Sequence, residues 1–188
     1  MSAVAAPATT RLFVALEIPA AVRDALAAAR DTLDPAVWRP LDDAALHVTL
    51  VFLGRRPVEE IEPVAAVVEA VAARAARPVA LRLAEPLRLP PRRTRVMAVG
   101  LADAGGHAAA LQADLVDTLA AAGLHEPEAR PFRPHVTVGR VRPRARPGGE
   151  RWPGPPPLAF EVERVALFAS RLHPGGARYE ALAGASLR

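Results

Sequence analysis

The chain has 188 residues, a formal net charge of +4 and a hydrophobic fraction of 51%. This length suits one domain, or two small lobes that share one core. The chain contains no Cys, which excludes disulfides, thiolate metal sites and a Cys nucleophile.

Hydrophobic periodicity divides the chain into strands and helices. Residues 1–10 are expected to be a disordered leader, and residues 11–188 a single bilobal domain. Helices are predicted over residues 20–33, over 58–76, where Pro63 marks a kink or an early turn, and over 105–122, ending at Gly123. Strands are predicted over residues 11–18, 46–54, 79–83, 96–101, 134–141, 158–170 (one long strand or a pair) and 177–183.

Proline-rich stretches separate several of these elements and are predicted as loops. The segment around Trp38 is one, and residues 87–93, which follow a strand expected to end before Pro86, are another. Residues 142–157 form a long Pro-, Gly- and Arg-rich loop, which is either a tolerated surface insertion or a basic flap near a phosphate ligand. Residues 171–177 are predicted to turn a hairpin.

The order of the elements indicates the fold class. Strands outnumber helices, and several strands follow one another with no helix between them. This favours an α+β fold with mainly antiparallel sheets over a doubly wound parallel sheet.

Two tetrapeptides repeat within predicted strands, 88 residues apart: His47-Val48-Thr49-Leu50 and His135-Val136-Thr137-Val138. Because side chains alternate along a strand, each His shares a face with the Thr two residues later, and the apolar residues point to the other face. The repetition predicts an internal duplication. We therefore expect two pseudo-symmetric lobes that line a central cleft, with helices on the outside, each lobe projecting one His and one Thr into the cleft.

Two opposed imidazoles suit acid–base chemistry at phosphorus. An unperturbed His has a pKa near 6.5, so one ring can take a proton from water while the other gives one to a leaving oxygen. The Thr hydroxyls would hold the non-bridging oxygens. The sequence lacks His-x-His, HExxH and Cys ligand patterns, so we expect no metal and no cofactor.

All 24 basic residues are Arg. Either a compositional bias that also enriches Ala and Pro accounts for this, or a positive surface favours phosphorylated ligands. No apolar stretch approaches the ~20 residues of a membrane span, and no signal peptide is evident. The expected protein is cytoplasmic, does not enter a membrane and has no obligatory protein partner.

The paired His-x-Thr motifs resemble those of the two-histidine phosphoesterases. The flanking stretches look like the RNA 2′,3′-cyclic phosphodiesterases of bacteria and archaea, historically called 2′-5′ RNA ligases. The matching segments are RLFVALEIP, LHVTLVFLG, FRPHVTVGR and VALFASRLHPGGARYEAL, which span nearly the whole chain.

This resemblance implies metal-independent hydrolysis of an RNA terminal 2′,3′-cyclic phosphate to a 2′-phosphomonoester. It implies that His47 is the proton donor and His135 the proton acceptor, with Thr49 and Thr137 on the phosphate. It further implies that Phe52 and Arg140 sandwich the terminal base, which is consistent with stacking of bases on rings and guanidinium planes. Strict alternation puts Phe52 on the opposite face from His47, so this role requires a strand end or a bulge. Arg95 and Tyr179 are further candidates for binding the substrate.

Two other functions remain open. One is the joining of RNA ends by the reverse reaction, and the other is a non-catalytic module that binds nucleotides or RNA ends. The sequence does not identify the physiological RNA or the oligomeric state.

Overall fold

The computed structural model describes residues 8–75, 77–149, 151–173 and 176–187. Three α-helices occupy the predicted places: α1 (Ala20–Arg30), α2 (Ile61–Arg74) and α3 (His107–Ala121). Two short 3-10 turns precede β3 and α2: η1 (Asp43–Ala45) and η2 (Val58–Glu60). The strands are β1 (Thr9–Glu17), β2 (Trp38–Pro40), β3 (His47–Pro57), β4 (Val79–Leu89), β5 (Val96–Ala102), β6 (His135–Val141), β7 (Ala159–Val162), β8 (Arg164–His173) and β9 (Gly176–Ser186).

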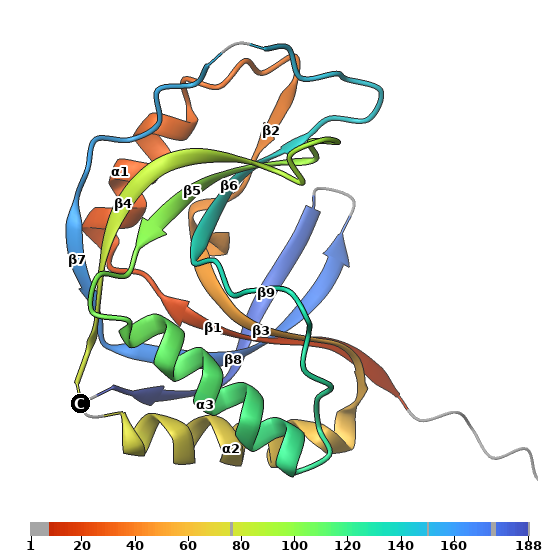
Figure 1. The fold of residues 1–188 in the computed structure, drawn as a ribbon. Coiled ribbons are helices and arrows are strands. Elements are labelled where there is room, and N and C mark those ends of the chain that lie inside the picture. The colour runs from red at the N-terminus through yellow and green to blue at the C-terminus, as the bar shows by residue number, and fades with distance from the viewer. Residues whose placement is uncertain (1–7, 76, 150, 174–175, 188) are drawn as a thin grey trace, which may run out of the picture.

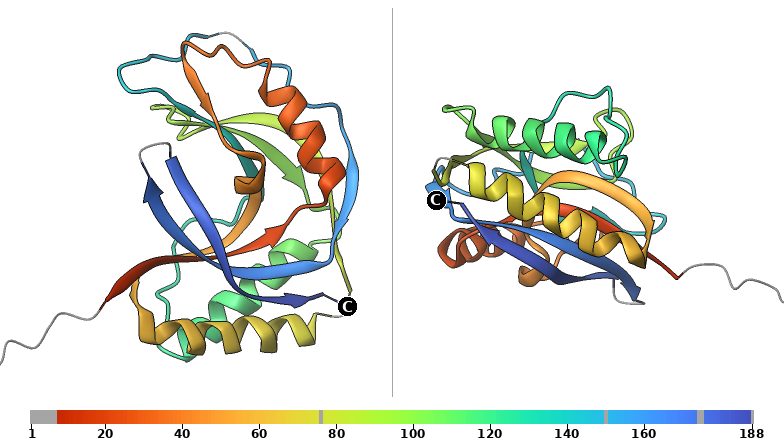
Figure 2. Two further views of the ribbon diagram at one scale, coloured as in Figure 1. Left: turned by 180° about the vertical axis from the view of Figure 1, so that it is seen from behind. Right: turned by 90° about the horizontal axis from the view of Figure 1, so that it is seen from below.

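The described strands form a single sheet in the order β7-β4-β5-β6-β3-β1-β8-β9, with β2 paired to β6. Neighbouring strands are antiparallel throughout this order. The two halves of the sheet meet between β3 and β6, where only Val48 and Val136 are paired. The halves curve away from this seam into two lobes (Figures 1 and 2). The prediction of a bilobal, mainly antiparallel α+β fold is confirmed.

The helices cover the outside of the curved sheet, as expected. α1 contacts β6, and α2 contacts β8, β9 and α3; Figure 1 shows α2 and α3 side by side beneath the sheet. α2 buries Val64, Val68 and Val71, which recur at helical spacing. Burial of each such side chain stabilises the fold by about 1.5–3 kcal/mol.

The same β-α-β order occurs twice along the chain. The first unit of this order is β1, α1 and β3, the second is β5, α3 and β6, and in each the two strands pair antiparallel. Ala15 pairs with Thr49 in the first unit, and Ala98 pairs with Thr137 in the second. Both alanines are fully buried. A small buried residue therefore lies beside each motif Thr.

Several predicted boundaries are wrong. β4 continues through Pro86 to Leu89, so residues 87–89 are strand and not loop. A register shift between Leu83 and Pro86 makes this possible, because an irregular position does not need the N–H that Pro lacks. β2 was missed because three residues carry no periodic pattern, and its partner β6 is distant in sequence.

Three other predictions concern residues 158–170, the C-terminal hairpin and the N-terminal leader. Residues 158–170 contain parts of two strands, β7 and β8, rather than one. β8 and β9 pair as the expected hairpin, although residues 174–175 of its turn lie outside the described residues. Residues 1–7 of the predicted leader also lie outside them, whereas Thr9 and Thr10 already belong to β1.

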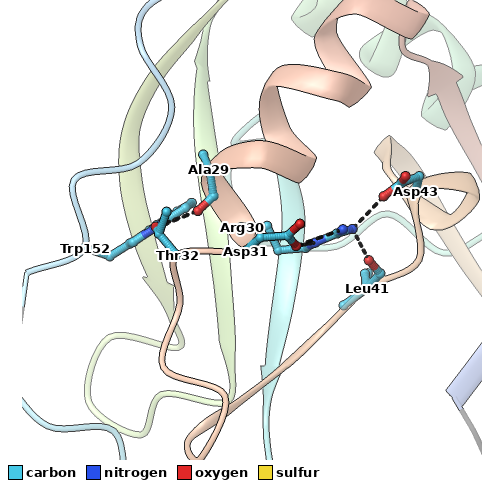
Figure 3. A network of polar contacts seen from close by, with 7 residues as sticks. All are labelled: Ala29, Arg30, Asp31, Thr32, Leu41, Asp43 and Trp152. Carbon is cyan, nitrogen blue, oxygen red and sulfur yellow. Dashed lines mark hydrogen bonds and ion pairs between the residues drawn. The ribbon is translucent and has the colours of Figure 1, made fainter.

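The loop over residues 142–157 is attached to the lobe by Trp152 (Figure 3). Its side chain is 8% exposed, and its indole N–H donates to Thr32 Oγ1 at 2.9 Å and to the Ala29 carbonyl at 3.2 Å. In the same network, Arg30 donates to the Leu41 carbonyl and to Asp43 Oδ1. The end of α1 thereby holds both the loop and the segment that leads into β3.

Candidate active site

The two His-x-Thr segments meet at the seam between the lobes. Val48 and Val136 pair antiparallel and are both fully buried. Because the two strands run in opposite directions from this pair, His47 lies opposite Thr137, and Thr49 lies opposite His135. These four side chains occupy the face opposite the buried valines. Two distant parts of the chain thus contribute to one polar site.

Both imidazoles are oriented in the same way. Nδ1 of His47 lies 2.8 Å from the Ala45 carbonyl oxygen, and Nδ1 of His135 lies 2.8 Å from the Arg133 carbonyl oxygen. A carbonyl oxygen only accepts, so Nδ1 donates in each case. Nε2 is therefore the nitrogen that can exchange a proton with a ligand. In the neutral ring, Nε2 of His47 accepts from the Thr49 hydroxyl at 3.1 Å.

Aromatic side chains enclose His47. Its ring centroid lies 4.8 Å from that of Phe13 and 5.1 Å from that of Tyr179, whose ring is perpendicular to it. Burial, together with weaker repulsion from His135 and Arg140, lowers the pKa of His47 to about 4, against the opposing hydrogen bond to Ala45. His47 is consequently neutral at neutral pH.

Two cavities open beside the seam and share Thr49, Phe52 and Thr137 in their walls. The first, of about 520 Å³, is lined by His47, and we call it the His47 cavity. The second, of about 880 Å³, is lined by His135, and we call it the His135 cavity. A group resting on the two Thr hydroxyls would therefore face one imidazole from each side.

The two cavities differ in chemistry. Three arginines, Arg11, Arg39 and Arg140, line the His47 cavity, and no acidic residue does so within the described part of the chain. Arg39 of β2 pairs with Arg140 of β6, so the three-residue strand that sequence analysis missed brings a second guanidinium to the site. This concentration of positive charge suits an anion.

The His135 cavity has a largely apolar wall. It runs between α3, the turn from β4 to β5, and the segment that leads into β6. Its apolar lining includes Pro91, Val96, Val116 and Phe132. This wall can accept an uncharged group such as a nucleobase.

Phe52 lies on the site face, against strict alternation. The pairing of β1 with β3 shifts between Val14 and Ala15, which places an additional residue in β3 at Leu50 and Val51. Those two residues are both buried, whereas Phe52 is 54% exposed and lines both cavities. The bulge that a stacking role requires is present, and the prediction from strict alternation that Phe52 lies on the opposite face from His47 is wrong.

The other predicted residues differ in position. Arg140 is exposed and lines the His47 cavity, and Tyr179 contacts the His47 ring. Arg95 is exposed just before β5 and is absent from the described lining of both cavities. Sequence reasoning missed six residues of the His47 cavity. Four of them are polar or aromatic and come from strands without a His-x-Thr motif: Arg11, Phe13, Arg39 and Ser170.

The described residues provide neither a metal cluster nor a membrane-spanning helix. Among them, no group of three or more His, Asp or Glu side chains is arranged to hold a metal ion. No helix in the described part of the chain is both long and apolar enough to cross a bilayer.

Comparison with known proteins identifies the family. The model of the 2′-5′ RNA ligase superfamily matches residues 18–173. The chain is 34% identical to an RNA 2′,3′-cyclic phosphodiesterase of Thermus thermophilus, over 95% of this chain and 90% of that protein.

Solved structures show the same similarity. The crystal structure of TT0787 from Thermus thermophilus has a TM-score of 0.79 and 32% identity, over 95% of this chain and 98% of that one. E. coli LigT in complex with 3′-AMP has a TM-score of 0.76 and 26% identity, over 96% of this chain and 99% of that one. The chain belongs to the 2′-5′ RNA ligase superfamily, as its paired His-x-Thr motifs led us to expect.

Proposed function

We propose that this enzyme hydrolyses the 2′,3′-cyclic phosphate at an RNA end to a 2′-phosphomonoester, by acid–base catalysis with His47 and His135 and without a metal ion. Membership of the family supports the general part of this proposal, that the protein is a phosphoesterase. The activity named for the Thermus relative supports the cyclic phosphate as the substrate. The nucleotide bound to LigT supports an RNA end as the ligand.

One observation carries the proposal. Two cavities, each with one imidazole, share a wall formed by Thr49 and Thr137. In an in-line displacement the attacking and leaving oxygens lie on opposite sides of phosphorus. A phosphate held by the two hydroxyls would therefore have one imidazole on each side, which is the arrangement this reaction needs.

The proposed step is as follows. Nε2 of His135 takes a proton from water, whose oxygen forms a bond to phosphorus. The bond from phosphorus to the ribose 3′ oxygen breaks, and Nε2–H of His47 protonates that oxygen. The 2′ oxygen keeps its bond to phosphorus, so the product is a 2′-phosphomonoester. Thr49 and Thr137 donate hydrogen bonds to the non-bridging oxygens as their charge shifts.

His47 must gain its proton when the substrate binds. Its pKa of about 4 leaves it neutral at neutral pH. An anionic phosphate beside the ring would raise this pKa, because an opposite charge favours the protonated form. The Thr49 hydroxyl, which now donates to Nε2, would turn to a phosphate oxygen at the same time. Anion binding would thus charge the ring that acts as the acid.

The terminal nucleoside is assigned to the His47 cavity. This cavity is on the side of the leaving 3′ oxygen and contains Arg140, Phe52 and Tyr179. We propose that the base stacks between Phe52 and Arg140 and that Tyr179 packs against the ribose or the ring of His47. Arg95, outside the described cavity walls, would contact a more distant part of the substrate.

A direct test incubates the protein with a short RNA that ends in a 2′,3′-cyclic phosphate, with excess EDTA. We expect a 2′-phosphomonoester as the product, at an undiminished rate in EDTA. A 3′-phosphomonoester would contradict the assignment of the leaving oxygen. An intact cyclic end after long incubation would support a binding module instead of an enzyme.

The size of the His135 cavity favours one further reaction. This cavity lies on the side of the attacking oxygen, and its 880 Å³ exceeds the space that a water molecule needs. A ribose 5′-hydroxyl placed there could attack phosphorus in place of water and leave a 2′-5′ linkage. The test adds an RNA with a 5′-hydroxyl to the cyclic-ended RNA and measures the joined product. Ala113→Trp, which would fill this cavity from α3, should lower joining relative to hydrolysis.

A further inference from the structure

Two arginine-rich segments lie side by side, and each contributes residues to the lining of one cavity. Residues 86–96 and 139–149 contain eight of the 24 basic residues and no Asp or Glu. Val96 pairs with Arg140, and the Val141 amide donates to the Arg95 carbonyl at 2.9 Å. Arg88 also donates to the Gly148 carbonyl. Six exposed arginines of these segments form what we call the arginine face: Arg92, Arg93, Arg95, Arg142, Arg144 and Arg146.

The charge of the arginine face is not neutralised by described carboxylates. None of its six members forms an ion pair with a described Asp or Glu. Elsewhere in the molecule, arginines such as Arg74 and Arg171 are paired with acidic residues. The arginine face therefore carries positive charge that no described carboxylate offsets locally.

The arginine face is continuous with the site. Arg140 lines the His47 cavity. It lies two residues before Arg142 along the chain, and in the sheet it pairs with Val96, the residue after Arg95. Figure 1 shows the tip of the β4–β5 hairpin, the upper end of β6 and the segment after it gathered at one end of the molecule. The backbone of an RNA that leaves the cavity could pass over this end of the molecule, because neither segment contains an Asp or Glu that would repel its phosphates.

We propose that the arginine face binds the phosphate backbone of a single-stranded RNA whose 3′ end occupies the site. Guanidinium groups donate paired hydrogen bonds to phosphate oxygens, and a positive groove that follows the backbone is how single strands are bound without regard to sequence. The inference rests on the proposed function and adds to it that the substrate is an oligonucleotide rather than a mononucleotide.

The binding test compares two double variants, Arg92→Gln/Arg93→Gln and Arg144→Gln/Arg146→Gln, with wild type. Arg142 is kept, because its Nε donates to the Pro35 carbonyl at 2.7 Å and supports the local backbone. The matched control is Arg77→Gln/Arg82→Gln, which removes two exposed arginines without described carboxylate partners. Arg82 lies seven strand residues from the tip of β4, roughly 20 Å away.

Binding is measured by fluorescence anisotropy with a labelled single-stranded RNA that carries a 3′-phosphate, between about 50 and 200 mM salt. Each face variant should bind the RNA about tenfold more weakly or worse. Each should also lower the slope of log affinity against log salt by about 1.4, since each lost phosphate contact contributes about 0.7. The control should match wild type within about twofold. Equal losses in the control and the face variants would overturn the proposal, because net charge alone would then explain them.

Kinetics provide the second readout. We expect kcat/KM for an oligonucleotide with a cyclic end to fall about tenfold in the face variants, and kcat/KM for a cyclic mononucleotide to stay unchanged. Equal loss on both substrates would overturn the proposal, because the arginines would then act at the reacting phosphate. A wild-type enzyme that hydrolyses neither substrate would refute the proposed function alone, while the anisotropy result would still decide whether the face binds RNA.

Discussion

The partly buried ionisable ring of His47 makes the stability of the protein depend on pH. Its pKa is lowered from 6.5 to about 4 in the folded state. The unfolded chain therefore binds more protons than the folded protein between these values, so stability is complete above about pH 6.5 and declines as pH falls toward 4. The shift of 2.5 units corresponds to at most about 3 kcal/mol, and about 2 kcal/mol of it is lost by pH 5.

The assay is urea unfolding of wild type and His47→Gln at about pH 7.5 and about pH 5. His47→Gln removes the titrating group and keeps a side chain that can donate a hydrogen bond to the Ala45 carbonyl. The other titratable groups are common to both proteins and cancel in the comparison. Wild type should lose about 2 kcal/mol more than the variant on acidification. Equal losses would refute the account of His47 as a desolvated, neutral ring.

Three further predictions concern the surroundings of the site. Trp152→Ala should lower the free energy of unfolding, measured in urea, by about 3–5 kcal/mol. Trp152→Phe should lower it by about 1–2 kcal/mol, because it loses the hydrogen bonds of the indole and part of the packing. Equal effects would show that the loop is not anchored by its indole. Thr49→Val and Thr137→Val should each lower kcat by about 10²-fold, with little change in Tm, because each removes one donor to the phosphate; an unchanged kcat in either variant would exclude that hydroxyl from the reaction. Tyr179→Ala should raise the pKa of His47, because the substitution opens one side of the imidazole ring to water. The pKa is measured by NMR titration of the ring. A pKa that stays near 4 would mean that Tyr179 does not contribute to the burial of His47.

The sequence predicts most of the fold because the fold is encoded in local patterns. The apolar spacing of Leu111, Leu115 and Leu119 predicts α3, and these three side chains are its buried face. The repeated tetrapeptides predict the two lobes, and Val48 and Val136 pair at the seam. Local periodicity was sufficient in these places because burial on one face is what produces it.

Other features depend on strand partners that no local pattern reveals. The position of Phe52 depends on a bulge in the pairing of β1 with β3, and strict alternation alone gives the wrong face. Arg39 reaches the site through β2, whose three residues pair with β6 about 100 positions later in the chain. Pro86 suggested the end of a strand, yet a register shift lets β4 continue past it. Sequence alone could not predict these contacts, since each is set by tertiary pairing.

The two halves of the loop over residues 142–157 differ in their contacts. Its second half is anchored through Trp152 on α1, which no pattern in the Pro- and Gly-rich segment indicated. Its first half carries Arg142, Arg144 and Arg146, which are exposed next to the β4–β5 hairpin. Trp152 thus holds part of the loop against the lobe, and the arginines of its first half belong to the face for which we infer RNA binding.

The central claim is that His47 and His135 act on one phosphorus atom in a single step. It is tested most directly by kcat/KM of His47→Ala, His135→Ala and the double variant, on an RNA with a 2′,3′-cyclic phosphate end. Each single variant should lose at least about 10²-fold, and the double variant should be little worse than the poorer single one, because groups that act as a unit are not additive. A single variant that retains wild-type activity, or losses that multiply in the double variant, would contradict the claim.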